Sequence, residues 1–215
     1  MPYVYNRNEI RAAVFDFIYG CALRDAILQK AFECEDKKWV RKVTVAQALV
    51  RNYIDCILRG DYASPASKSR HDEFFISTAN AVCAAINSAK PSSCACTFTF
   101  GNAQKLINMT VKHVYAHTYS CPKTRECFRN CHCPMDSIML EKVWKAYKDT
   151  FDDKSRKAAL ISSDYFHSAW SNEGITLPLS LLPNRYERFQ NAIVEIIAKN
   201  GGDILPIEYD YLVWA

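Results

Sequence analysis

Two residues near the middle of the chain, Lys105 and Asp136, have the types and surroundings of a nucleophile and its carboxylate partner. Lys105 ends the segment 100–105, Phe-Gly-Asn-Ala-Gln-Lys, which runs into an apolar-periodic stretch, LINMTVKHVY. A glycine before a helix allows close backbone approach, and the N–H groups at a helix start favour an anion such as phosphate. The positive end of the helix dipole disfavours a protonated amine, so a lysine there is suited to nucleophilic attack. The alternative is an ordinary solvated lysine.

Asp136 follows 31 residues after Lys105, in the stretch Cys-Pro-Met-Asp-Ser-Ile-Met-Leu. An aspartate placed two residues after a proline and directly before an apolar run is typical of a helix N-cap. Capping alone is a sufficient role for it. The functional alternative is a carboxylate that the helix start holds rigidly and directs into a cleft.

This lysine, followed by a Pro-x-Asp that opens a helix, resembles the arrangement in helix-hairpin-helix DNA glycosylases. The long gap between Lys105 and Asp136, with an apolar helix similar to QKLINMTVKHVYA after the lysine, is most similar to the archaeal-type 8-oxoguanine DNA glycosylase branch. The segment 206–214, PIEYDYLVW, resembles the terminal segment of that branch, where an aspartate and a tryptophan four residues apart line the base pocket. The resemblance covers residues 100–145 and 206–214.

The resemblance implies an enzyme, a DNA N-glycosylase, that flips a modified base out of double-stranded DNA and releases it. Lys105 would attack the sugar C1′ and form a Schiff base, which also permits cleavage of the abasic site. Asp136 would stabilise the cationic sugar. This chemistry requires no metal and no other cofactor.

Two further sets of residues are implied by the same resemblance. Asp210 and Trp214 would read the flipped base by hydrogen bonding and stacking. The residues expected to hold the DNA backbone are Gly101, Asn102, Gln104 and Lys112. The identity of the base stays open: oxidised guanine indicates DNA repair, whereas a hypermodified phage base indicates antiviral defence.

The elements that position these residues are predicted to be helices. The 215 residues are 49% apolar and 23% charged, which fits a single domain over 1–215 with a buried core. The resemblance implies a helical glycosylase-like fold with the active site in a cleft between two helical subdomains. Apolar residues recur at three- and four-residue steps and no segment alternates as a strand does, so we predict an all-α fold. The apolar residues at this spacing are Ile10, Val14, Phe17, Ile18 and Cys21 in one predicted helix, which Gly20 could kink or split, and Tyr186, Phe189 and Ile193 in another.

Composition restricts location and partners. No run of about 18 apolar residues is present, and the N-terminus MPYVYNRNEIR does not have the pattern of a secretory signal. We therefore expect a cytoplasmic monomer that does not enter a membrane. The net charge of +4 permits a polyanionic partner.

Two alternative functions are compatible with these features. The first is an all-helical interaction or nucleic-acid-binding module without catalysis. The second is a metal-dependent nuclease that uses His132, His167 and nearby acids, or the pair His113 and His117, one helical turn apart. Six cysteines also cluster, although their spacing reproduces no usual zinc signature: Cys94, Cys96, Cys121, Cys127, Cys131 and Cys133.

Overall fold

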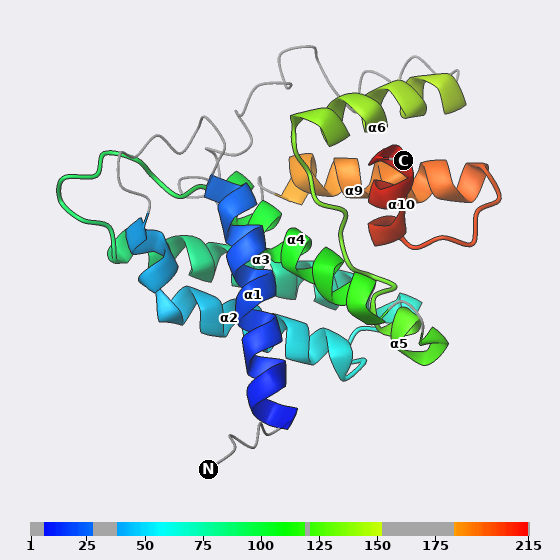
Figure 1. Ribbon diagram of the computed structural model, residues 1–215. Helices are drawn as coiled ribbons and strands as arrows, with labels where there is room; N and C mark the ends of the chain where they lie inside the picture. The colour runs from blue at the N-terminus through cyan, green and yellow to red at the C-terminus, as the bar shows by residue number, and fades with distance from the viewer. Residues whose placement is uncertain (1–6, 28–37, 119–120, 152–182, 215) are drawn as a thin grey trace.

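The computed structural model describes residues 7–27, 38–118, 121–151 and 183–214, and all regular structure in these ranges is helical (Figure 1). The all-α prediction is confirmed for this part of the chain. The α-helices are α1 (Arg7–Ile27), α2 (Thr44–Leu58), α3 (Lys68–Ser88), α4 (Phe100–Thr118), α5 (Pro122–Cys127), α6 (Ser137–Thr150), α9 (Pro183–Lys199) and α10 (Pro206–Trp214). Two short 3-10 helices, η1 (Lys38–Lys42) and η2 (Pro65–Ser67), precede α2 and α3. No helix in the described ranges has the length and apolar character needed to cross a membrane.

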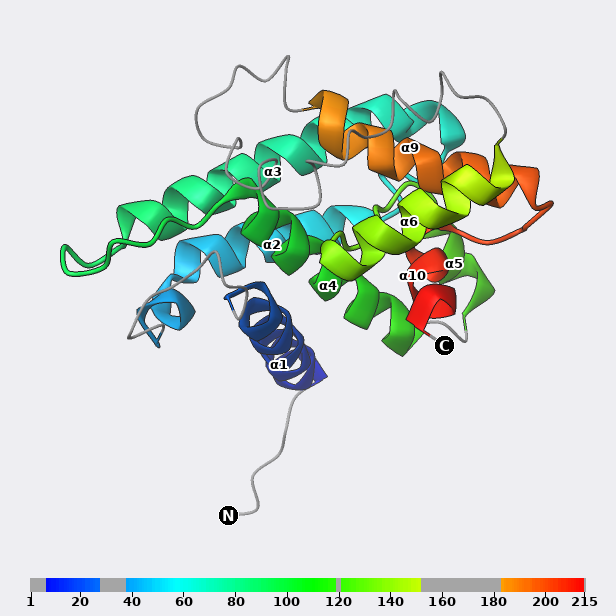
Figure 2. The ribbon, with the colours of Figure 1, turned by 90° about the horizontal axis from the view of Figure 1, so that it is seen from above.

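Helix α4 lies at the centre of the fold. Twelve of its 19 residues are buried, on nearly every side, so it does not have the single apolar stripe of a surface helix. Helices α1 and α3 pack against it, and α2 packs on α3. A second group, α6, α9 and α10, packs together beside it, as Figures 1 and 2 show. One cluster of buried apolar side chains extends from Phe15 in α1 to Ile207 in α10.

The start of α4 differs from the sequence prediction. Thr99 caps this helix, because its Oγ1 accepts a hydrogen bond from Asn102 N at 3.4 Å and its carbonyl accepts one from Ala103 N at 3.0 Å. Gly101 therefore belongs to the first turn of the helix and is not part of a preceding hairpin turn. Lys105 lies in the second turn, beyond the strongest part of the helix dipole.

Helix α1 also departs from the predicted pattern. It runs without interruption through Gly20, and of the apolar residues at the predicted spacing Ile18 is buried whereas Ile10, Val14 and Phe17 are exposed. The face that packs on α4 carries Ile18, Ala22 and other buried residues between Phe15 and Ile27.

Candidate active site

The structure brings Lys105 and Asp136 together. Lys105 Nζ lies 3.3 Å from Asp136 Oδ2, and the two side chains are only 15% and 21% exposed. Asp136 is the N-cap of α6, because its Oδ1 accepts a hydrogen bond from Met139 N at 3.0 Å. One carboxylate oxygen is thus used to start the helix, and the other faces the amine.

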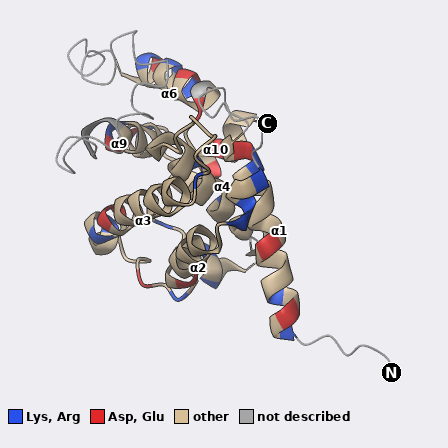
Figure 3. Ribbon diagram, turned by 90° about the vertical axis from the view of Figure 1, so that its left-hand side faces the viewer, with Lys and Arg blue, Asp and Glu red and all other residues tan. Residues whose placement is uncertain are grey.

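A second charged pair, Lys112 and Asp210, lies near the first. Lys112 is seven residues after Lys105, so it shares the same face of α4 about 10 Å further along the helix. Its Nζ bonds Asp210 Oδ2, and only 2% of the Asp210 side chain is exposed. Burial raises the pKa of Asp210, although hydrogen bonds from Lys112 and Trp214 act in the opposite direction. Figure 3 shows acidic positions of α10 beside basic positions of α4.

The buried thiol of Cys133 lies among these charges. Its pKa is raised by burial first, and then by the negative charges of Asp210 and Asp136, while Lys112 acts to lower it. Since these effects fall off with distance, Asp210, Lys112 and Asp136 are all close enough to the Cys133 thiol to act on its pKa.

Trp214 occupies the last described position of the chain and is 54% exposed. It shares α10 with Asp210, one helical turn before it, as the sequence predicts. The start of α10 is fixed by Glu208, whose carboxylate accepts hydrogen bonds from Leu205 N at 2.7 Å and from the guanidinium of Arg125.

Three of the residues expected to hold the DNA backbone point inward. Gly101, Asn102 and Gln104 are buried, and the last two are completely so. The Asn102 amide donates to the carbonyl of Ala26 at 2.8 Å, and the Gln104 amide donates to the carbonyl of Met135 at 2.6 Å. These two side chains do not face DNA, and we do not assign them to phosphate binding. The fourth residue, Lys112, is bound to Asp210.

A buried polar cluster, of which the sequence analysis named only His132, joins α3, the segment before α6 and α9. Asp72 Oδ1 accepts hydrogen bonds from His132 Nε2 at 2.9 Å and from His71 Nδ1 at 3.3 Å. The other ring nitrogens meet two tyrosine hydroxyls, His71 with Tyr53 at 2.7 Å and His132 with Tyr186 at 3.1 Å. One signal was available in the sequence: His71 is four residues before the buried Phe75, on the face of α3 that enters the core.

The charges of this cluster are set by its burial. Burial lowers the pKa of His132 to about 4 and also lowers that of His71, so both rings are neutral at pH 7. Burial alone would raise the pKa of Asp72, but hydrogen bonds from His132 and His71 hold it well below its usual range. The ammonium of Lys68, 2.6 Å from Asp72 Oδ2, balances the carboxylate charge.

The three side chains His71, Asp72 and His132 also have the composition of a metal site. One ligand atom from each lies within 4.8 Å of the others, and no other such group occurs among the described residues. A divalent cation there would lie close to the Lys68 ammonium and would compete with hydrogen bonds that already satisfy both rings. The donors are suitable for a metal, whereas their surroundings favour the metal-free network.

The other candidates for metal binding are separated in the structure. His117 is exposed, and His113 Nε2 is buried and has no hydrogen-bond partner among the described residues. His167 lies outside the described residues. Of the clustered cysteines, Cys121 is exposed and the thiols of Cys94 and Cys96 approach to 2.7 Å.

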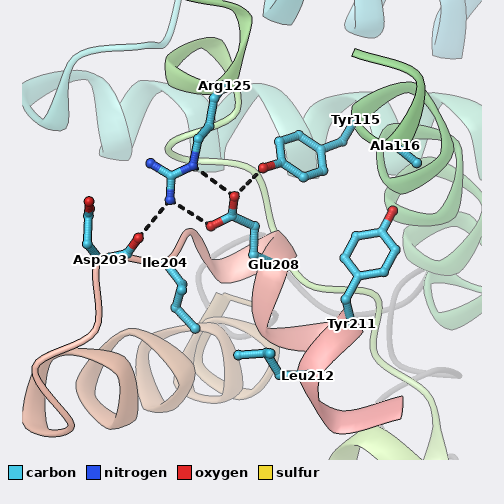
Figure 4. Close-up of a pocket in the computed structure, with 8 residues that line it drawn as sticks. All are labelled: Tyr115, Ala116, Arg125, Asp203, Ile204, Glu208, Tyr211 and Leu212. Atoms are coloured by element: carbon cyan, nitrogen blue, oxygen red, sulfur yellow. Dashed lines mark hydrogen bonds and ion pairs between the residues drawn. The ribbon is translucent and has the colours of Figure 1, made fainter. Parts of the chain in front are cut away.

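A cavity of about 520 Å³ lies between the end of α4 and α10 (Figure 4). Its polar part consists of Arg125, which pairs with Glu208 and donates to the Asp203 carbonyl at 2.8 Å, and Tyr115, which also bonds Glu208. Through its pair with Glu208, Arg125 anchors α10 to α5.

Comparison of the chain with protein-family models, with curated proteins and with solved structures finds no match. The functional argument therefore depends on the residues and their geometry.

Proposed function

We propose that the protein is a DNA glycosylase that excises a modified base, with Lys105 as nucleophile and Asp136 as its carboxylate partner. The observation that carries this proposal is the 3.3 Å approach of Lys105 Nζ to Asp136 Oδ2 across 31 residues of sequence. An amine beside a fixed carboxylate in a partly buried site is the arrangement that covalent catalysis at a sugar carbon needs.

The proposed reaction uses the two side chains in sequence. Asp136 takes a proton from Lys105, and the free amine attacks C1′ of the flipped nucleotide. The new N–C1′ bond forms as the glycosidic bond breaks, and the base leaves with the bonding electrons and takes the proton from Asp136. This transfer restores the Asp136 carboxylate, whose negative charge stabilises the positive charge that develops on the sugar. Opening of the sugar ring gives the Schiff base, from which the DNA strand can break by β-elimination.

Base recognition is assigned to Trp214, whose exposed indole offers a surface for stacking. Asp210 was expected to bond the N–H edge of the base, but its side chain is almost completely buried and is paired with Lys112, so we assign it the role of holding Lys112. Asp210 and Trp214 both lie on α10, which Glu208 and Arg125 fix to the rest of the fold.

A screen of DNA duplexes tests the function directly. Each duplex carries one modified base, including oxidised guanine and hypermodified phage bases, and alkali after the reaction reveals abasic sites. We expect one class of duplex to be cut in the presence of a chelator, and Lys105→Gln to remove that activity. Lys142→Gln changes an exposed lysine of α6 and is the matched control, which should stay active.

A second candidate is a metal-dependent nuclease, since the donor atoms of His71, Asp72 and His132 lie close together. Its activity would disappear in the chelator, return with added zinc and persist in Lys105→Gln. Absence of both base release and strand cleavage on every duplex, with or without metal, would instead indicate a module without catalysis.

A further inference from the structure

The segment that leads to Asp136 is held by two glutamines from different helices. Gln104 of α4 donates to Met135 O at 2.6 Å and accepts from Met135 N at 3.2 Å. Gln190 of α9 does the same with Cys133, which it meets through two bonds of 2.9 Å. Each carboxamide therefore satisfies both backbone groups of one residue, as an adjacent β-strand would.

These contacts leave the segment little freedom to move. Gln104 and Gln190 are 0% and 3% exposed, so water cannot replace their hydrogen bonds. A buried backbone group that loses its hydrogen-bond partner destabilises the fold by about 1–3 kcal/mol, so displacement of Cys133 or Met135 is strongly unfavourable. Pro134 lies between the two paired residues, and its ring restricts the backbone there.

Gln104 is also the immediate neighbour of Lys105 in α4. The same helical turn therefore carries the proposed nucleophile and the side chain that holds the residue before its carboxylate partner. Any shift of Met135 relative to Gln104 would change the separation of Lys105 and Asp136 directly. Since misplacement of a reacting group by about 1 Å can reduce a rate by about 10²-fold, this separation is a sensitive quantity.

We infer that Gln104 is a positioning residue, which sets the approach of Asp136 to Lys105 and contacts no DNA, and that Gln190 holds the same segment from the side of α9. This inference depends on the proposed glycosylase function for its effect on rate. The separation of Lys105 Nζ and Asp136 Oδ2, which Gln104 is inferred to set, can be measured without any enzymatic activity.

The variant Gln104→Met tests it, because methionine keeps the volume of the side chain and removes both bonds to Met135, together with one to Gly101 O and one from Asn108. Asn87→Leu is the control: Asn87 makes the same two-bond pair with Phe98, at 2.8 Å and 2.8 Å, in a segment that does not lead to Asp136. Both variants should lose thermal stability, Gln104→Met the more, and both should bind undamaged duplex as the wild type does. Only Gln104→Met should lose the single-turnover rate of base release, on the order of 10²-fold.

Two results would overturn the inference: a wild-type rate in Gln104→Met, or an equal loss of rate in Asn87→Leu. A crystal structure of Gln104→Met gives the second readout, since an unchanged separation of Lys105 Nζ and Asp136 Oδ2 would also contradict it. If Gln104→Met does not fold, Gln190→Met loosens the same segment and takes its place. If the wild-type protein is inactive on all duplexes, the proposed function is wrong. The separation of Lys105 Nζ and Asp136 Oδ2 in the crystal structure of Gln104→Met then tests the positioning role by itself.

Discussion

The carboxylate of Asp136 has two separable roles, one for each oxygen. Oδ1 caps α6 through Met139, and Oδ2 meets the Lys105 amine. Capping is a structural role that many residues can perform, whereas a negative charge beside a developing cation is a catalytic one. The geometry allows substitutions that keep the first role and remove the second.

Asp136→Asn makes this separation, because asparagine caps a helix about as well as aspartate and carries no charge. We expect the rate of base release to fall about 10²-fold or more. The free energy of unfolding, measured by denaturant titration, should change by less than the roughly 1 kcal/mol that loss of a cap costs. Asp136→Ala removes the cap as well and should lose both rate and stability. A fully active Asp136→Asn would limit Asp136 to capping.

Single residues differed in how well the sequence predicted them. The cap pattern after a proline correctly located the start of α6 at Asp136, and Lys105 lies beside it, as the resemblance implied. Asn102 and Gln104 were assigned to DNA through the same resemblance, with a hairpin turn expected before Lys105. The true start of α4 at Phe100 turns both amides into the core, where they bond the carbonyls of Ala26 and Met135. Periodicity gives the spacing of a face and does not reveal which polar side chains a buried partner satisfies.

At the scale of elements, apolar spacing predicted the buried face correctly for α9 and only in part for α1, where Ile18 is buried as expected. Tyr186, Phe189 and Ile193 are all buried, because charged residues on the opposite side of α9 leave only one apolar face. Helix α1 is apolar on more than one side, so spacing alone did not identify the face that packs on α4. Phe17 is therefore 71% exposed although it shares the predicted spacing.

The cluster that joins α3 to the segment before α6 makes stability depend on pH. Because burial lowers the pKa of His132 to about 4, the unfolded chain binds this proton more readily between about pH 6.5 and pH 4. The contribution of the neutral His132 ring to the free energy of unfolding is thus fully present above pH 6.5 and is lost as the pH falls from about 6.5 to 4. The loss from His132 alone should be about 2 kcal/mol between pH 7 and pH 5.

Urea titrations at pH 7 and pH 5 measure this effect. We expect the wild type to lose more stability between these two values than His132→Gln does. His117→Gln changes an exposed histidine and should keep the dependence of the wild type. Equal losses in the wild type and in His132→Gln would show that His132 is not held neutral by the fold.

At the scale of the whole molecule, the two helix groups meet at charged and polar side chains as well as apolar ones. Lys105 of α4 pairs with Asp136, the N-cap of α6, and Lys112 of α4 pairs with Asp210 in α10. Four partly or fully buried charges are costly to assemble unless they pair, and their pairing fixes how the two groups approach. The proposed reaction would take place at this junction.

Borohydride trapping with peptide mapping tests the central claim most directly. Borohydride reduces the Schiff base while the protein reacts with a duplex that the screen has shown to be a substrate, and the DNA is then joined covalently to the protein. Mass spectrometry of the digested adduct identifies the residue that carries the DNA. We expect a single adduct at Lys105 and none in Lys105→Gln, with Lys142→Gln trapped as well as the wild type. An adduct at another lysine, or trapping that persists in Lys105→Gln, would contradict the assignment of Lys105 as the nucleophile.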